Sequence, residues 1–276
     1  MDIKKRRSAL YLPCSKPRVL EKSLSVPADV LLYDLEDAVD PSQKEEARDN
    51  LVNFFQRCGP INKEVVVRIN GLDTPWGYDD LVALKDLSID GLCLPKAESV
   101  EAINEALAVI AKEVPVWLNI ETPKGVLQVE QLASEETVHV ILMGTNDLSK
   151  CMRMLPPVDD SAFHYAFSRC IMAARAYDCD ILDGVYNAFK DVDGFTFACT
   201  SGKALGFDGK TLIHPDQIAP ANQIFSPSSD ELAQAKAIVE AWNNRDATQG
   251  IAVLNGAIIE QLHVDHAHRL IQLASE

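Results

Sequence analysis

The sequence predicts an α/β protein, in the form of a (β/α)8 barrel with a helical extension at the carboxyl end. First, short apolar runs alternate with amphipathic helical patterns, which is typical of parallel strands joined by helices. Second, these runs number eight, and a length of 276 residues fits one such barrel. A doubly wound open sheet is the alternative, but no GxGxxG motif follows the first strand to support it.

The expected strands are recognised by continuous apolar runs such as VLLYDL and EVVVRI, which indicate burial on both faces. In chain order they are 9–12, 30–35, 65–69, 91–94, 116–120, 138–143, 180–185 and 211–213. The clearest helical patterns are 43–57, 100–113, 162–177 and 231–243, and the second has apolar residues at 103, 106, 107, 110 and 111. We expect a catalytic barrel over residues 1–245 and a helical lid segment over 246–276 that packs on a neighbouring subunit.

Composition narrows the class of protein. A hydrophobic content of 47% allows a large core, and no apolar stretch reaches the ~18 residues of a membrane helix. The apolar run before Pro13 is too short for a signal peptide, so a cytoplasmic setting is expected. Seven scattered cysteines without a CxxC motif indicate reduced thiols. The net charge of −15 disfavours nucleic acid and anionic membranes as partners.

Polar residues follow most of the strand runs. They are Cys14 and Ser15, Glu36 and Asp37, Arg68 and Asn70, Lys96, Glu121, Asp147 and His214. In a barrel the carboxyl ends of the strands converge on one mouth, where catalytic residues lie. A lone carboxylate after a strand is more often a helix cap or a surface ion pair, so the recurrence around the ring carries the inference.

Glu121 and Asp147 are the most informative of these residues. Each follows an apolar strand and precedes helix-forming sequence, so both should project from neighbouring strand ends. Oxygen ligands favour a hard cation such as Mg²⁺, and no Cys or His lies at a spacing that would indicate zinc. The sequence therefore predicts a Mg²⁺ site at the barrel mouth.

These motifs resemble the citrate lyase β-subunit-like family of CoA-ester lyases, which belongs to the HpcH/HpaI aldolase superfamily and includes malyl-CoA and citramalyl-CoA lyases. The resemblance covers nearly the whole chain, and its most specific motifs are DLEDAV, VRIN, ETPKG and NDL. It implies a barrel of the phosphoenolpyruvate/pyruvate-binding type that uses Mg²⁺. The implied reaction cleaves or forms malyl-, citramalyl- or citryl-CoA, with an acyl-CoA and a 2-oxo acid as the other partners. A homotrimer or hexamer is also implied, in which the tail of one subunit covers the mouth of its neighbour.

The resemblance implies roles for residues at the mouth. Glu121 and Asp147 match the metal ligands, and Arg68 matches the arginine that contacts substrate oxygens. Glu36 and Asp37 match carboxylates that orient Arg68 and water, with a purely stabilising ion-pair network as the other reading. On the residues alone, side-chain alternation puts positions 34 and 36 on one face of the strand end.

The CoA and acid/base roles fall on residues outside the carboxylates. Lys16, Arg18 and Lys22 follow the first strand near one helix start, where they suit phosphate oxygens. The resemblance assigns Arg18 to the nucleotide phosphates, with Lys96 as a further contact. Glu260 replaces an aspartate that, in relatives, reaches the neighbouring subunit's site as acid or base. Its extra methylene should tune, shift or weaken that step.

Two alternatives keep different parts of this interpretation. An aldolase on free 2-oxo acids, or a citrate lyase β subunit that depends on a carrier protein, would keep the fold and the site; weak affinity for free CoA thioesters would favour the carrier-dependent subunit. A non-catalytic scaffold would keep the barrel alone, but it has no need to hold two desolvated carboxylates together without a cation. The histidines at 263, 266 and 268 are expected to be solvated, and His214 is expected to hydrogen-bond at the barrel rim.

Overall fold

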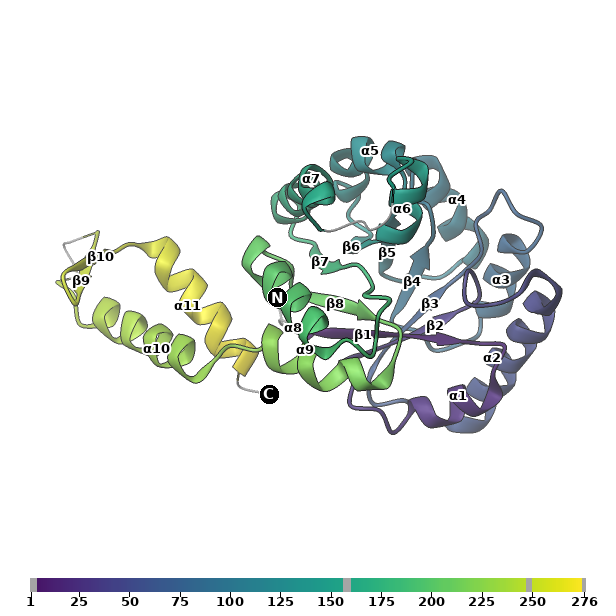
Figure 1. The fold of residues 1–276 in the computed structure, drawn as a ribbon, viewed down its shortest axis with the longest axis horizontal. Helices are drawn as coiled ribbons and strands as arrows, with labels where there is room; N and C mark the ends of the chain where they lie inside the picture. Colours follow the sequence, from purple (N-terminus) through teal and green to yellow (C-terminus); the bar gives the residue numbers. More distant parts are fainter. Residues whose placement is uncertain (1–3, 156–159, 247–249, 275–276) are drawn as a thin grey trace. The chain divides into compact units, whose positions relative to one another are not determined.

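The computed structural model describes residues 4–155, 160–246 and 250–274, and it confirms the predicted α/β barrel (Figure 1). Eight strands form a closed barrel in chain order, and the last pairs with the first. Every pairing in this barrel is parallel. The strands are β1 Ser8–Pro13, β2 Val30–Asp34, β3 Glu64–Arg68, β4 Gly91–Leu94, β5 Val116–Ile120, β6 Val138–Met143, β7 Asp180–Asp183 and β8 Gly209–Leu212.

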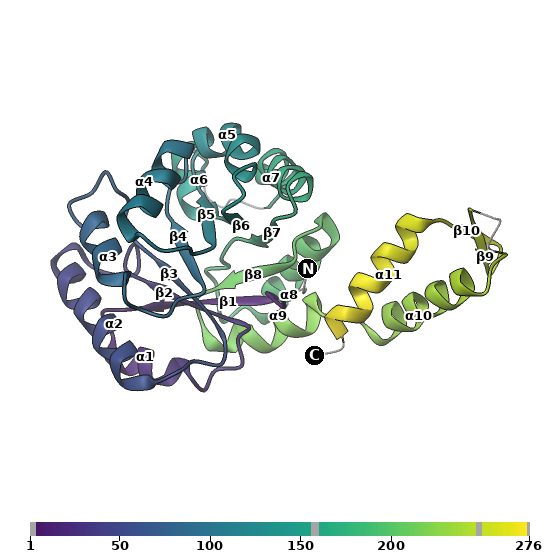
Figure 2. The ribbon, with the colours of Figure 1, turned by 180° about the vertical axis from the view of Figure 1, so that it is seen from behind.

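Helices surround the strands, as Figures 1 and 2 show from opposite sides. They are α1 Pro17–Ser23, α2 Lys44–Cys58, α3 Gly77–Leu84, α4 Val100–Ile110, α5 Pro123–Ala133, α6 Thr145–Cys151, α7 His164–Ala176, α8 Val192–Leu205 and α9 Ile218–Phe225, with short 3₁₀ turns at Pro41–Gln43, Asp160–Phe163 and Pro215–Gln217. In α4 the expected apolar stripe is buried at Ile103, Ala106 and Ile110, and Ser99 caps the helix by accepting a hydrogen bond from the Ala102 amide.

All eight predicted strands are present, with ends shifted by one or two residues at most. The largest shifts are in β7 and β8. Strand β7 stops at Asp183, because the Asp183 carboxylate accepts the Gly184 amide and turns the chain. The buried pair of Lys210 and Asp183 then ties β8 to β7.

The inside of the barrel is apolar. Its core residues are Ala9, Val30, Leu32, Val66, Cys93, Trp117, Val140, Leu142 and Leu182. At the end where the strands start, Arg6 forms ion pairs with Glu64 at 2.7 Å and Asp180 at 2.6 Å, and its guanidinium lies 5.2 Å from the Trp117 ring centroid. We call this the Arg6 cluster. It closes one end of the barrel with paired charges, so the polar residues at the other end remain for function.

The C-terminal part of the chain forms a second compact unit, which is described here by itself. It contains α10 Ser229–Asn243, a hairpin of β9 Ala252–Leu254 and β10 Ala257–Ile259, and α11 Gln261–Ala274. The hairpin turns at Asn255 and Gly256, both with positive φ, as an Asn-Gly turn requires. Helix α10 packs on α11, and the two compact units of the chain meet between Asn222 and Gln223. The predicted role of residues 246–276 as a lid on a neighbouring subunit stays a prediction.

No helix among the described residues is long and apolar enough to cross a bilayer.

Candidate active site

A cavity of about 220 Å³ lies at the carboxyl end of the barrel. The side chains that line it come from the ends of several strands: Tyr11 of β1, Asp34 of β2, Arg68 of β3, Glu121 after β5 and Asp147 after β6 are among them. This is the convergence that the pattern of polar residues after strands predicted.

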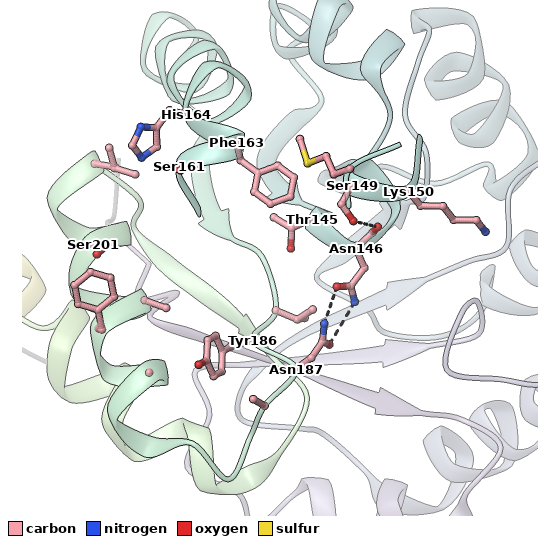
Figure 3. A pocket seen from close by; sticks show the side chains of 17 residues that line it. Thr145, Asn146, Ser149, Lys150, Ser161, Phe163, His164, Tyr186, Asn187 and Ser201 are labelled. Atoms are coloured by element: carbon pink, nitrogen blue, oxygen red, sulfur yellow. Dashed lines mark hydrogen bonds between the residues drawn. The ribbon is translucent and has the colours of Figure 1, made fainter. Parts of the chain in front are cut away.

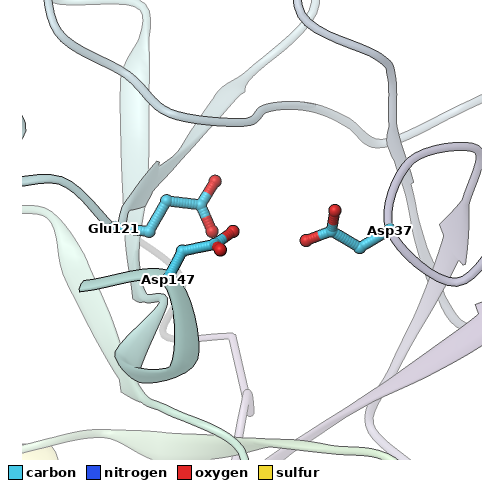
Figure 4. Close-up of side chains that lie close together, drawn as sticks. All are labelled: Asp37, Glu121 and Asp147. Atoms are coloured by element: carbon cyan, nitrogen blue, oxygen red, sulfur yellow. The ribbon is translucent and has the colours of Figure 1, made fainter. Parts of the chain in front are cut away.

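Three carboxylates meet at one point of this cavity (Figure 4). Asp37, Glu121 and Asp147 each place an oxygen within 4.8 Å of the others. Glu121 and Asp147 lie next to each other, and Asp37 faces them from the loop after β2. The sequence pointed to Glu121 and Asp147 for a metal and gave Asp37 a supporting role; the structure places Asp37 in the same cluster.

Glu121 is held in a fixed position. It is 3% exposed, and its two oxygens accept hydrogen bonds from the Lys96 amide at 2.8 Å and from Asn119 Nδ2 at 2.6 Å. Lys96 donates from a left-handed conformation, with φ of 45°. Gly144 passes directly beside Glu121, since a Cβ at position 144 would lie 2.3 Å from Glu121 Cβ. Only glycine therefore lets the loop after β6 bring Asp147 to this place.

The electrostatics of Glu121 fit a bound cation. The pKa of Glu121 is raised to about 8, chiefly because the carboxyl group is buried; the charge of Glu36 adds to the rise, and Arg68 and Lys96 oppose it. Asn119 Oδ1, buried in the same wall, has no hydrogen-bond partner among the described residues. Glu121 is buried, whereas Asp147 is partly exposed and Asp37 is exposed. Three carboxylates that converge on one point suit a hard divalent ion such as Mg²⁺ that keeps some of its water ligands. Within the described residues, this is also the one group of three or more potential metal ligands.

Arg68 is fixed beside the carboxylates. Its Nε and Nη2 donate to the two oxygens of fully buried Asp34 at 2.8 and 2.6 Å, and its Nη1 lies 3.1 Å from Glu36 Oε2. Tyr11 lies beneath the guanidinium, with its ring centroid 4.6 Å from Cζ. Burial alone would lower the pKa of Arg68, but the charge and hydrogen bonds of Asp34, together with Tyr11 and Glu36, outweigh it, and the pKa lies well above its usual range.

The geometry of Arg68 leaves donors for a ligand. A guanidinium has five N–H groups, and the hydrogen bonds to Asp34 occupy the one on Nε and one of the two on Nη2. Nη1 forms an ion pair with Glu36, so N–H groups on Nη1 and Nη2 remain for a ligand. The sequence named Glu36 and Asp37 as the residues that orient Arg68. In the structure Asp34 makes the bidentate contact with Arg68. Glu36 forms an ion pair with Nη1 of Arg68, and Asp37 Oδ2 lies 3.9 Å from the same nitrogen.

Lys96 connects the two halves of the site. Its Nζ lies 2.9 Å from Glu36 Oε1 and 3.8 Å from Asp147 Oδ2. The side chain is half exposed. Burial lowers the pKa of Lys96, but Glu36, Glu121 and Asp37 together raise it above its usual range. In this arrangement Lys96 balances the acidic cluster, and its predicted contact with CoA stays a prediction.

The predicted phosphate-binding residues lie outside this cavity. Lys16 precedes α1, Arg18 is in its first turn and Lys22 in its last turn; all three are exposed and form no ion pair with a described residue. Their role stays a prediction. Cys14, just before them, is buried, and burial raises the pKa of its thiol well above the usual range. A buried thiol with a raised pKa is a poor nucleophile.

Glu260 belongs to the C-terminal unit. It is exposed between β10 and α11, and its amide donates to His263 Nδ1 at 3.0 Å. The predicted contact with a neighbouring subunit's site stays a prediction. At the barrel rim, His214 Nδ1 accepts the Asp216 amide and the His214 ring stacks on Phe189 at 4.4 Å, which is the structural role expected for it.

Together the fold and the site define a barrel enzyme of the kind that places its chemistry at the carboxyl ends of parallel strands, with an acidic cluster and an arginine facing each other. The chain belongs to the HpcH/HpaI aldolase/citrate lyase family, whose sequence profile matches residues 7–215.

Curated relatives match over almost their full length. A (3S)-malyl-CoA thioesterase of Cereibacter sphaeroides is 40% identical over 269 residues, covering 97% of this chain and 94% of the relative. Citrate lyase subunit beta of Haemophilus influenzae is 32% identical, covering 99% and 98%. L-malyl-CoA/beta-methylmalyl-CoA lyase of Rhodobacter capsulatus is 30% identical, covering 97% and 94%.

Solved structures share the same barrel. CitE of Mycobacterium tuberculosis, in complex with magnesium, acetoacetate and coenzyme A, superimposes with a TM-score of 0.83 at 27% identity over 98% of both chains. The citrate lyase beta subunit of the same organism, complexed with oxaloacetate and magnesium, gives a TM-score of 0.71 at 29% identity over 80% of this chain and 97% of that one.

Proposed function

We propose that this chain is a Mg²⁺-dependent enzyme that acts on a 3-hydroxyacyl-CoA thioester such as malyl-, citramalyl- or citryl-CoA. We further propose that it breaks the Cα–Cβ bond to give an acyl-CoA and a 2-oxo acid. The observation that carries the proposal is the convergence of Asp37, Glu121 and Asp147 beside the guanidinium of Arg68. Relatives named for malyl-CoA and citrate, and related structures that contain magnesium with oxo acids, support it.

Glu121 and Asp147 are the proposed metal ligands, and we add Asp37 as the third carboxylate that faces them. When bound, Mg²⁺ would act as a Lewis acid toward the carboxylate and carbonyl oxygens of the oxo acid. The ordered hydrogen bonds from Lys96 and Asn119 keep the Glu121 oxygens aimed at one place. The site would therefore need little reorganisation when the cation binds.

Arg68 is the proposed group that stabilises the developing negative charge. In cleavage the hydroxyl group on Cβ loses its proton, the electron pair of the Cα–Cβ bond passes to Cα, and both products pass through oxyanions. The remaining N–H groups on Nη1 and Nη2 of Arg68 can point at one of these oxygens because Asp34 and Glu36 fix the guanidinium. The removal of one such donor typically lowers the rate by ~10²- to 10³-fold.

Two parts of the proposal lie outside the mouth cavity. Glu260 of the partner subunit in a trimer or hexamer is the proposed acid or base that exchanges a proton with Cα. Lys16, Arg18 and Lys22 are the proposed contacts for the CoA phosphates, since exposed cations close together on a helix suit anionic oxygens.

Hydrolysis of the thioester is the second candidate function. It is favoured by the 40% identity to a (3S)-malyl-CoA thioesterase, which exceeds the 30% identity to the malyl-CoA/β-methylmalyl-CoA lyase over the same share of this chain. In that reaction water would attack the thioester carbonyl and release the CoA thiol and the free hydroxy acid. The carboxylate cluster and Arg68 would hold the same end of the substrate.

One assay separates these functions. The purified protein is incubated with Mg²⁺ and malyl-, citramalyl-, β-methylmalyl- or citryl-CoA, and free 2-oxo acid and free thiol are measured in the same sample. Oxo acid without thiol establishes the lyase, and thiol with hydroxy acid establishes the thioesterase. If neither product forms with any thioester while free aldol adducts of pyruvate are cleaved, the assignment to CoA thioesters is wrong. Glu121→Gln is the control that should abolish either activity.

A further inference from the structure

A second, larger cavity adjoins the mouth of the barrel (Figure 3). It is a groove of about 1110 Å³ lined by α6, α7, α8 and the loop after β7. The groove and the 220 Å³ mouth cavity have four lining residues in common: Thr145, Asn146, Val185 and Asn187. These residues are therefore the boundary between the carboxylate cluster and the groove.

Two contacts close the boundary between the groove and the mouth cavity. Asn187 Nδ2 donates to Asn146 Oδ1 at 2.7 Å, and Asn146 Nδ2 lies 3.4 Å from Asn187 Oδ1, so the two amides bridge the first turn of α6 and the loop after β7 (Figure 3). Beside this bridge, a Cβ at Gly184 would lie 2.6 Å from Thr145 Oγ1. The segments around Gly184 and Thr145 are thus already in close contact, and the amide pair spans the rest of the boundary between the groove and the mouth cavity.

The groove differs in chemistry from the mouth. Among the described residues no Asp or Glu lines the groove. Apolar side chains such as Phe163, Phe197 and Leu205 form part of its wall, and polar ones that include Ser201, Lys150 and His164 form the rest. The apolar part of the wall favours an uncharged alkyl chain.

We propose that Asn146 and Asn187 determine chain-length specificity. With the amide pair intact, the 2-oxo acid portion of the substrate is confined to the mouth cavity, which selects short side chains. Without the pair, a longer alkyl side chain extends from the carboxylate cluster into the groove. This inference rests on the proposed function, because it assumes that a 2-oxo acid is held at the carboxylates.

The size of the effect follows from the burial of methylene groups. Each CH₂ moved from water to an apolar wall favours binding by ~4-fold. Two additional methylenes should therefore strengthen binding about 15-fold in a variant that opens the boundary. Both amide side chains are exposed and neutral, so their loss should leave the fold intact.

The test uses Asn187→Ala in the full-length protein, because Asn146 adjoins Asp147. Dissociation constants for glyoxylate, pyruvate, 2-oxobutanoate and 2-oxopentanoate are measured by calorimetry with Mg²⁺, and kcat/KM is measured for the matching thioesters. We expect the preference for 2-oxopentanoate over pyruvate to rise about 15-fold in the variant, with Mg²⁺ affinity unchanged. Ser201→Ala, which alters the groove but not the mouth, should keep the wild-type preference.

A third variant tests whether Asn187 acts by closing the boundary or by positioning the loop after β7. Asn187→Leu fills the same place without hydrogen bonds, so the proposal expects a wild-type preference. Uniform weakening of all four acids in Asn187→Ala, or an equal shift in Asn187→Leu, would overturn the proposal. The binding measurement needs no turnover, so this proposal and the proposed function can fail separately. A shifted oxo-acid preference without thioester cleavage contradicts only the proposed reaction. Thioester cleavage with an unchanged oxo-acid preference contradicts only the role proposed for Asn146 and Asn187.

Discussion

Arg68 offers the sharpest test of the site, because its loss and its replacement by lysine have different consequences. Asp34 is fully buried and accepts two hydrogen bonds from Arg68. Arg68→Ala leaves that carboxylate without its cation, and the breaking of a buried pair typically costs about 3–5 kcal/mol. A single domain has about 5–15 kcal/mol in total, so this variant should be severely destabilised.

Arg68→Lys keeps the positive charge but loses the planar guanidinium that donates two parallel hydrogen bonds. One ammonium cannot donate to both Asp34 oxygens in the guanidinium geometry and also reach Glu36, so one charge-assisted hydrogen bond is lost, which costs about 1.5–3 kcal/mol. The protein should still fold, and kcat/KM should fall by ~10²- to 10³-fold because no aligned donor remains for the oxyanion.

The measurements are urea unfolding for stability, product release for kcat/KM and calorimetry for Mg²⁺. Mg²⁺ affinity should stay within a few-fold of wild type in Arg68→Lys, since the carboxylates of the metal cluster are intact. Turnover near the wild-type value in a folded Arg68→Lys sample would refute the role given to this residue.

Three further predictions concern other parts of the molecule. The pKa of Glu121 is raised to about 8, so Mg²⁺ must displace a proton below that pH; calorimetry should show affinity rising ~tenfold per pH unit and levelling above about 8. Between pH 4.5 and about 8 the folded protein keeps the Glu121 proton, whereas the unfolded chain, with a pKa of 4.5 for this group, has lost it. In EDTA the free energy of unfolding should therefore fall as the pH rises from 4.5 to about 8. Glu121→Gln should remove this pH dependence. Gly144→Ala would place a methyl group 2.3 Å from Glu121 Cβ, and displacement of that side chain by about 1 Å should weaken activity by ~10²-fold and Mg²⁺ binding with it; an unchanged Mg²⁺ titration would contradict the close approach. Arg6→Met removes the cation between Glu64 and Asp180 and should lower the free energy of unfolding in urea by about 3–5 kcal/mol while kcat/KM at low temperature stays unchanged.

The sequence predicted the barrel because strands buried on both faces leave continuous apolar runs that helical periodicity interrupts. It also predicted that Glu121, Asp147 and Arg68 would meet, because parallel strands end at the same rim. These inferences need only the type and order of elements, which local patterns carry well. Strand ends were less accurate, as at Asp183, where a side chain bonds to the next backbone amide.

The partner of Arg68 was harder to assign. The run from Asp34 to Asp37 has three carboxylates within four residues, and the chain leaves the strand there, so alternation no longer decides where each side chain points. The missing signal was strand register: Asp34 and Arg68 are direct partners across β2 and β3. The packing of helix α10 on α11 is likewise not readable from local patterns, since it depends on contacts between segments that are apart in sequence.

The Arg6 cluster has a consequence for protein engineering. Its salt bridges join the beginnings of β1, β3 and β7, whereas every residue of the carboxylate cluster follows the end of a strand. Mutagenesis libraries that vary only the loops after the strands would leave the Arg6 cluster unchanged. Such libraries should yield many soluble variants, which makes the chain a suitable scaffold for the directed evolution of new carbon–carbon bond chemistry.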